Sequence, residues 1–234
     1  MKNQKLIYWL LGIFAVVFIG GALIIPTPAI KKQVISIGNI ITGHNTKTTG
    51  ATHSVAHTDL GEKYQLSKNE IKTLGQLKVT GIGDSIMVRT TPDLKEIFKS
   101  FNVDAKVGRQ VSAAPSVISQ LKANDAIQKN VLVNLGTNGP TDAAAIDGII
   151  NQIGSNHQIY WVNTRVPGKK WQDSNNKLIA AAAKKYNNVH LIDWLYMSQD
   201  NDNWFVDDNL HPNTLGEREY TATVGQTMAK TATP

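Results

Sequence analysis

The sequence contains no cysteine. This absence excludes disulfide bonds, a thiol nucleophile, and zinc or iron–sulfur sites held by thiolates. No group of histidine and acidic residues has the spacing of a metal site either. We therefore expect no metal and no other cofactor.

A basic excess is lacking in most of the chain, although the formal net charge is +6. The excess lies before Val79, because basic and acidic residues are equal in number from Val79 to the end. A nucleic-acid-binding domain is expected to carry the basic patch itself. We therefore expect no nucleic-acid partner.

One long run without charge lies near the start, at Leu6–Ile25, and prolines follow at Pro26 and Pro28. A helix over this run would be roughly 30 Å long at about 1.5 Å per residue, the thickness of a bilayer core. The sequence predicts a membrane anchor over residues 1–30 that meets the lipid bilayer through residues 6–25. A cleaved secretory signal is the alternative. A short leader usually stays cytoplasmic, so we expect the rest of the chain on the extracytoplasmic side.

Residues 31–76 are rich in Thr, Gly, Asn and His over much of their length and show no convincing hydrophobic period. Such a composition is typical of a flexible linker, here a juxtamembrane one. A short helix is expected within it near Gly61–Leu77, leading into the next segment.

Residues 77–234 alternate short apolar runs with longer helical patterns. Strands are expected at Leu77–Gly83, Val103–Val107, Asn130–Leu135, Gln158–Val162 and Val189–Asp193. Helices are expected at Thr91–Ser100, Ala113–Ala123, Asp142–Ile153, Gln172–Tyr186 and Thr214–Lys230. The alternation predicts a three-layer α/β/α domain with a five-stranded parallel sheet. Ligands of such sheets bind beyond the carboxyl ends of the strands.

Ser85 follows the first expected strand in the sequence Gly83-Asp84-Ser85. A glycine permits the tight turn, and a serine at a helix start has a backbone N–H that can stabilise an oxyanion. An ordinary helix cap would look the same. Gly108 and Asn138 follow the second and third strands, where a backbone and a side-chain amide can point at the same crevice. Both residue types are also common in plain turns.

Asp208 and His211 lie three residues apart near the end of the chain. A serine hydroxyl needs a base to remove its proton, and neutral histidine can do this near pH 7. A carboxylate three residues earlier can bend back to the other ring nitrogen and fix the tautomer. A loop histidine with solvated acids is the alternative for this fragment alone.

Four segments, taken in chain order, resemble the four blocks of the SGNH (GDSL-type) hydrolase superfamily. They are Gly83-Asp84-Ser85, Gly108, Gly136-Thr137-Asn138 and Asp208-Asn209-Leu210-His211. The resemblance implies a flavodoxin-like α/β/α fold with Ser85 as nucleophile, His211 as general acid and base, and Asp208 orienting His211. It also implies an oxyanion hole formed by the N–H groups of Ser85 and Gly108 and the side chain of Asn138.

Three further segments are similar to the extracytoplasmic C-terminal domain of peptidoglycan O-acetyltransferases: Val103–Gln110, Val162–Pro167 and Ile192–Trp194. In that family the domain places an acetyl group on the C6 hydroxyl of a muramoyl sugar. The many-helix membrane half of the family is not part of this sequence. We therefore expect either a separate membrane acyltransferase that supplies acetyl groups or a domain that hydrolyses esters.

The resulting expectation is a membrane-anchored extracytoplasmic serine O-acyltransferase that acetylates a cell-wall glycan through an acyl-Ser85 intermediate. Arg165, Trp171 and Trp204 are expected on loops near strand ends, where they would line a substrate cleft. Packing in the core or at its rim is the alternative for both tryptophans. A carbohydrate or small-ester acetylesterase and a non-catalytic wall-binding module remain the alternative functions.

Overall fold

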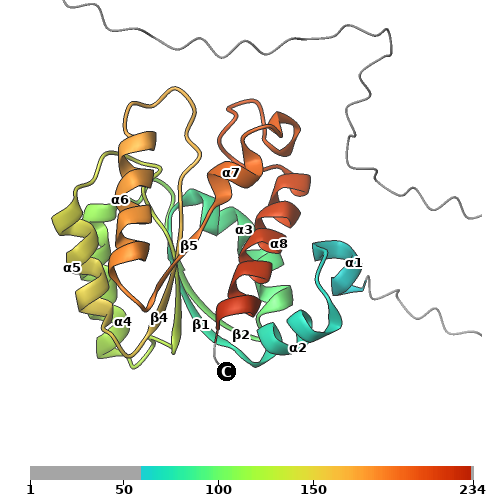
Figure 1. The fold of residues 1–234 in the computed structure, drawn as a ribbon, viewed down its shortest axis with the longest axis horizontal. Coiled ribbons are helices and arrows are strands. Elements are labelled where there is room, and N and C mark those ends of the chain that lie inside the picture. The colour runs from blue at the N-terminus through green and yellow to red at the C-terminus, as the bar shows by residue number, and fades with distance from the viewer. Residues whose placement is uncertain (1–58, 233–234) are drawn as a thin grey trace, which may run out of the picture. The chain divides into compact units, whose positions relative to one another are not determined.

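The computed structural model describes residues 59–232, which form a five-stranded sheet between two layers of helices (Figure 1). The strand order is β2-β1-β3-β4-β5, and every neighbouring pair is parallel. The three-layer fold with a five-stranded parallel sheet, predicted from the alternating pattern, is therefore confirmed.

The strands follow the apolar runs, with one shift at the edge of the sheet. They are β1 Lys78–Gly83, β2 Ser100–Ala105, β3 Asn130–Asn134, β4 Gln158–Val162 and β5 Val189–Ile192. β2 begins at Ser100 instead of Val103, and Ser100 and Asn102 pair with Lys78 and Thr80 of β1. An edge strand has one open side and accommodates exposed polar residues, which an apolar pattern does not mark.

Eight α-helices occur in the described residues. They are α1 Leu60–Tyr64, α2 Lys68–Gln76, α3 Ser85–Ile97, α4 Ala114–Ala123, α5 Ala143–Ile153, α6 Gln172–Lys185, α7 Trp194–Ser198 and α8 Thr214–Thr231. Two short 3₁₀ helices, η1 Val111–Ala113 and η2 Asp202–Trp204, precede α4 and α8. The helix α7 is the one that the sequence pattern did not predict, because it spans little more than a turn.

The helix α3 begins at Ser85, as expected for the serine that follows the first strand, whereas the helical pattern in the sequence starts only at Thr91. The side chain of Asp84 caps it by accepting the backbone N–H of Ile86 at 3.0 Å. Pro92 lies inside the helix, and the hydroxyl of Thr91 bonds back to the carbonyl of Met87 at 2.6 Å. Threonine and proline are weak helix formers, so the first turns carry little helical signal.

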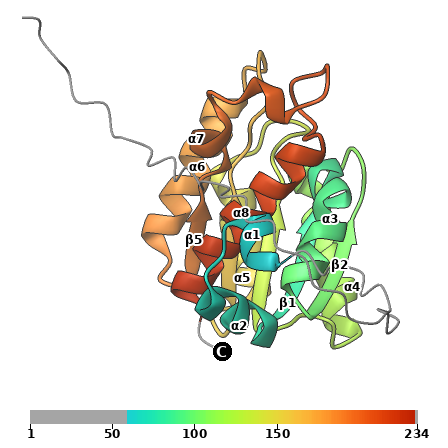
Figure 2. The ribbon, with the colours of Figure 1, turned by 90° about the vertical axis from the view of Figure 1, so that its right-hand side faces the viewer.

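The two faces of the sheet bury alternate residues of each strand, as the pleat requires. On β3, Leu132 packs among α2, α3 and α8, whereas Val131 and Val133 pack among α4, α5 and α6. On β4, Tyr160 and Trp161 divide in the same way. Figure 1 shows the two helical layers on either side of the sheet, and Figure 2 shows α1, α2 and α8 in front of it.

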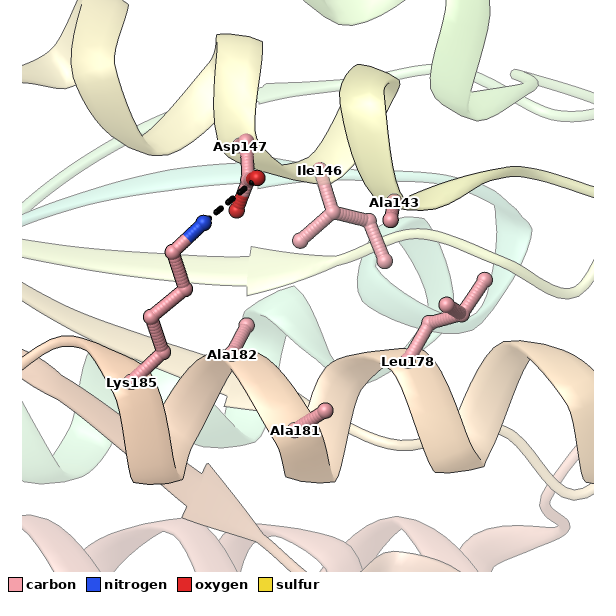
Figure 3. Close-up of a pocket in the computed structure, with 7 residues that line it drawn as sticks. All are labelled: Ala143, Ile146, Asp147, Leu178, Ala181, Ala182 and Lys185. Carbon is pink, nitrogen blue, oxygen red and sulfur yellow. Dashed lines mark hydrogen bonds and ion pairs between the residues drawn. The ribbon is translucent and has the colours of Figure 1, made fainter.

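A small hollow of about 100 Å³ separates α5 from α6 on the outer surface (Figure 3). It is lined by Ala143, Ile146, Asp147, Leu178, Ala181, Ala182 and Lys185. Lys185 Nζ forms an ion pair with Asp147 at 2.7 Å at one side. The hollow shares no residue with the site described below.

Residues 60–76 lie within the expected linker, yet they include α1 and α2, which pack against the rest of the domain. Ser67 and Glu70 make a capping box at the start of α2. Tyr64 and Leu74 are fully buried, and Tyr64 Oη donates a hydrogen bond to Asp93 at 2.7 Å. Within the described residues, α1 and α2 therefore pack with the rest of the domain, and the short helix expected near Gly61–Leu77 is present as these two helices.

The expected anchor over residues 1–30 and the linker up to residue 58 lie outside the described residues. Within residues 59–232, no helix combines the length and the apolar character needed to cross a membrane.

Leu74→Ala should lower the free energy of unfolding by about 2–5 kcal/mol, because it removes a fully buried side chain from the core. Urea unfolding of the chain, followed by tryptophan fluorescence, measures this loss. Lys72→Ala on the exposed side of α2 is the matched control and should change little. Equal stability of the two variants would show that α2 does not belong to the domain.

Candidate active site

Ser85 stands where β1 ends and α3 begins, at the carboxyl edge of the sheet. Gly83 permits the sharp turn, since a Cβ at this position would overlap the Met87 side chain. The backbone N–H of Asp84 donates to the carbonyl of Asn134 at 3.1 Å and ties the turn to β3. Ser85 is 8% exposed, so its hydroxyl is held at the floor of the site.

Asp208 and His211 come from the segment 199–213, which connects α7 to α8. Asp208 Oδ1 accepts the backbone N–H groups of Leu210 and His211, both at 2.9 Å. Asp208 Oδ2 lies 2.6 Å from His211 Nδ1. Asn209 between them has a φ of 53°, and this left-handed turn lets the carboxylate reach back over the loop.

His211 Nε2 lies 2.9 Å from Ser85 Oγ. The carboxylate of Asp208 can only accept, so Nδ1 carries the proton and Nε2 is left to accept the serine hydroxyl. The structure thus brings Ser85, His211 and Asp208 into one line of hydrogen bonds. Their order is the one that the spacing in the sequence predicts.

The two acids of the site, Asp208 and Asp84, have shifted pKa values in opposite directions. Burial alone would raise the pKa of Asp208, but hydrogen bonds from the His211 side chain and from the backbone N–H groups of His211 and Leu210 lower it to about 2. Burial raises the pKa of Asp84 to about 6, against the opposing effect of the Ile86 N–H. Asp208 is therefore held ionised, whereas Asp84 is an acid that costs energy to ionise.

Asn138, from the loop after β3, donates from Nδ2 to Asp84 Oδ2 at 3.3 Å and to the carbonyl of Arg109 at 3.2 Å. Both neighbours are acceptors, so the amide nitrogen faces the residue next to Ser85. Both protons of Nδ2 are engaged in this structure. Asn138 can serve an oxyanion only when one of these two hydrogen bonds is exchanged for it.

Gly108 lies in the exposed loop between β2 and η1 with a φ of +74°, a conformation that favours glycine. The next residue, Arg109, fixes this loop: Nη1 donates to the carbonyl of Gly83 at 3.2 Å and to that of Asp104 at 2.5 Å. Gly108 and Arg109 also line a groove of about 460 Å³ that continues along α4 past Ser112 to Gln120. The groove therefore borders the loop that contacts Asn138.

The structure places the three expected cleft residues differently. Arg165 is 7% exposed and its guanidinium contacts the protein itself, so the prediction that it lines the cleft does not fit the structure. Trp171 donates from its indole N–H to the carbonyl of Thr137 at 3.1 Å and is half-buried beside the Asn138 loop. Trp204 stacks on Trp194 with ring centroids 5.9 Å apart and packs against the core.

Sequence reasoning missed Asp84 as a member of the site. Its position directly after a buried strand is a signal for a helix cap, and it does cap α3. Its contact with Asn138 joins two distant segments and leaves no local pattern. Within residues 59–232, no three His, Cys, Asp or Glu side chains come together in a way that could hold a metal ion.

Carboxyl ¹³C NMR should find Asp208 titrating near pH 2 and Asp84 near pH 6, because hydrogen bonds stabilise one carboxylate and burial disfavours the other. By linkage, Asp208 contributes to folding stability above pH 3.8, the pKa of an aspartate in the unfolded chain, and this contribution is lost as the pH falls through about 2. Asp84 contributes to folding stability below pH 3.8, and this contribution is lost as the pH rises through about 6.

His211→Ala serves as the control for this titration. It removes the side-chain hydrogen bond from His211 that lowers the pKa of Asp208, and should therefore move that pKa upward. An Asp208 that titrates at its ordinary value in the unmodified chain would contradict the described hydrogen bonds.

Comparisons with known proteins point to one class. No family model matches the chain. The peptidoglycan O-acetyltransferase OatA of Listeria monocytogenes is 35% identical over 153 residues, which are 65% of this chain and 24% of the relative. The O-acetyltransferase OatA of Staphylococcus aureus is 36% identical over 168 residues, or 71% of this chain and 27% of the relative. The chain thus spans about a quarter of the length of the curated relatives it matches.

A solved structure shares the fold: the C-terminal catalytic domain of the peptidoglycan O-acetyltransferase OatA of Streptococcus pneumoniae, with a methylsulfonyl adduct. Its TM-score is 0.58 at 18% identity, and the match covers 65% of this chain and 93% of that one. The resemblance stated from the sequence blocks is confirmed. Residues 59–232 have the fold of that catalytic domain, and the chain is similar in sequence to proteins named peptidoglycan O-acetyltransferases.

Proposed function

We propose that this domain is a serine O-acyltransferase that moves an acetyl group to a cell-wall glycan through an acyl-Ser85 intermediate. The observation that carries the proposal is the line of hydrogen bonds from Asp208 through His211 to Ser85, at 2.6 and 2.9 Å. A carboxylate, a neutral imidazole and a hydroxyl in this order are what nucleophilic catalysis by serine requires.

In the first half-reaction, Ser85 Oγ attacks the carbonyl carbon of the acyl donor while His211 Nε2 takes the hydroxyl proton. Asp208 keeps Nδ1–H directed away from the serine and stabilises the imidazolium that forms. When the tetrahedral intermediate collapses, His211 returns the proton to the leaving group. Ser85 is then acylated and His211 is neutral again.

The negative charge of the tetrahedral intermediate needs donors close to Ser85. The backbone N–H of Ser85 at the start of α3, the N–H of Gly108 and the Asn138 amide are the donors that we assign. Asn138 has to release Arg109 or Asp84 to take this role, since both of its protons are engaged in the resting structure. The release of the Arg109 carbonyl would leave Asn138 anchored to Asp84 and directed at the serine.

In the second half-reaction, a hydroxyl group attacks acyl-Ser85 while His211 takes the proton. A sugar hydroxyl gives transfer and water gives hydrolysis. The choice of a glycan acceptor rests on the sequence similarity to proteins named peptidoglycan O-acetyltransferases. The groove beside Gly108 supports it too, because Ser112, Ser116 and Gln120 supply neutral hydrogen-bonding groups of the kind that sugar hydroxyls use.

The proposal also includes the cellular setting. A helix over residues 6–25 would hold the chain in the cell membrane, with the domain on the extracytoplasmic side where peptidoglycan lies. A separate membrane acyltransferase would supply acetyl groups, because a single span gives no route for an acyl group across a bilayer. Protease treatment of intact cells should cleave the domain, and protection would contradict this orientation.

Ser85→Ala should abolish turnover of p-nitrophenyl acetate, because among the described residues Ser85 is the one whose hydroxyl bonds His211 Nε2. Mass spectrometry with chitooligosaccharide or muropeptide acceptors should then find acetylated sugar with the unmodified chain. If only free acetate is found, the domain is an esterase and not a transferase. If the unmodified chain is no faster than Ser85→Ala, the domain is not a serine enzyme. Binding of the chain to insoluble cell wall without acetylated sugar or acetate would indicate a wall-binding module.

Asn138→Ala should lower kcat for p-nitrophenyl acetate by about 10²–10³-fold, the usual cost of one oxyanion donor. Asn124→Ala, which removes the same amide from the exposed end of α4, is the matched control and should keep full activity. Equal kcat values for the two variants would remove Asn138 from the oxyanion hole.

A further inference from the structure

Asp208 and His211 need a support that their own packing does not supply. The side chain of Asp208 is 47% exposed and that of His211 is 30% exposed, and both lie on an irregular connection between α7 and α8. Exposed loops fluctuate more than packed elements. A hydrogen bond of 2.9 Å to a serine on a different element therefore requires that this loop be fixed from beneath.

Arg165 lies beneath the loop. It follows β4, and its side chain is 5% exposed. Nη1 donates to the backbone carbonyl of Asn209, and Nη2 donates to Asp202 Oδ1 at 2.5 Å. The guanidinium carbon lies 3.9 Å from the centroid of the Phe205 ring. Arg165 thus contacts the loop near its beginning at Asp202, near its middle at Phe205, and at Asn209, which lies between Asp208 and His211.

The contact with Asn209 is the important one. Asn209 has the left-handed φ of 53°, and its turn is what aligns two backbone N–H groups with the carboxylate of Asp208. A left-handed conformation at a residue other than glycine is disfavoured unless its surroundings hold it. The bond from Arg165 fixes the direction of the Asn209 carbonyl and so holds this turn.

We infer that Arg165 is a positioning residue for His211 and Asp208, acting through the backbone of Asn209. The inference rests on the proposed function, since the reaction it serves is that of Ser85. Arg165 is too buried to meet a substrate and acts on the reaction only through the loop.

Arginine is required for this arrangement because its planar guanidinium donates in two directions while its face stacks on an aromatic ring. A lysine can make one of these contacts at a time. Asp202 contributes less than the other two partners, since its side chain is 77% exposed and an exposed ion pair adds little. The contacts with the Asn209 carbonyl and Phe205 should therefore account for most of the effect.

The test compares Arg165→Met, Arg165→Lys and the control Asp202→Asn in the full chain. Kinetics with p-nitrophenyl acetate give kcat and KM, and proton NMR detects the downfield His211 Nδ1–H resonance that reports its hydrogen bond to Asp208. Arg165→Met should lower kcat by about 10–100-fold with KM little changed, because a displacement of about 1 Å costs this much. It should also broaden or remove the resonance. Arg165→Lys should recover part of both, and Asp202→Asn should resemble the unmodified chain.

A folded Arg165→Met with normal kcat and an intact resonance would overturn the inference. If Arg165→Met does not fold, Arg165→Lys decides: normal kcat with an intact resonance overturns the inference, and a lowered kcat with a weakened or lost resonance supports it. The resonance depends on the loop and not on turnover. If Ser85→Ala keeps the activity of the unmodified chain, the proposed reaction is rejected. Loss of the resonance in Arg165→Met would still support the positioning role of Arg165 in that case.

Discussion

The hydrogen bond between His211 Nε2 and Ser85 Oγ joins two segments that lie 126 residues apart in the chain. It exists because α3 and α8 pack together on the same face of the sheet, so that the start of α3 faces the loop that enters α8. Arg89 and Glu217 add a further contact between these helices at 2.8 Å. Every chemical step that we assign to the domain passes through this one hydrogen bond.

The strand order explains how the other groups reach the same place. β1 lies between β2 and β3, so the loops that follow β2 and β3 flank Ser85 on both sides. One loop supplies Gly108 and the other supplies Asn138, and the Arg109 carbonyl links them. Asp84 completes this link, since it caps α3 and accepts from Asn138. The groups that we propose as oxyanion donors and as nucleophile thus lie together at the edge of the sheet.

The sequence predicted the sheet, most of the helices and the grouping of Ser85, Asp208 and His211. Buried strands are marked by apolar runs, and the polar residues of a parallel α/β sheet that bind ligands lie just after its strands. The sequence also predicted one short helix near Gly61–Leu77, where the structure has α1 and α2. Their packing against the domain was not predicted, since short helices owe their stability to buried residues such as Tyr64 and Leu74. It assigned Arg165 to a cleft, because an arginine after a strand looks the same whether its guanidinium faces solvent or the underside of a loop. Contacts of that kind depend on three dimensions and leave no local signal.

Mass spectrometry of the chain after brief exposure to an activated acetyl ester tests directly whether Ser85 is the nucleophile. We expect one acetyl group on the peptide that contains Ser85, formed rapidly in the unmodified chain, slowly in His211→Ala and not at all in Ser85→Ala. Acetylation of a different residue, or equal labelling of the unmodified chain and Ser85→Ala, would contradict this expectation.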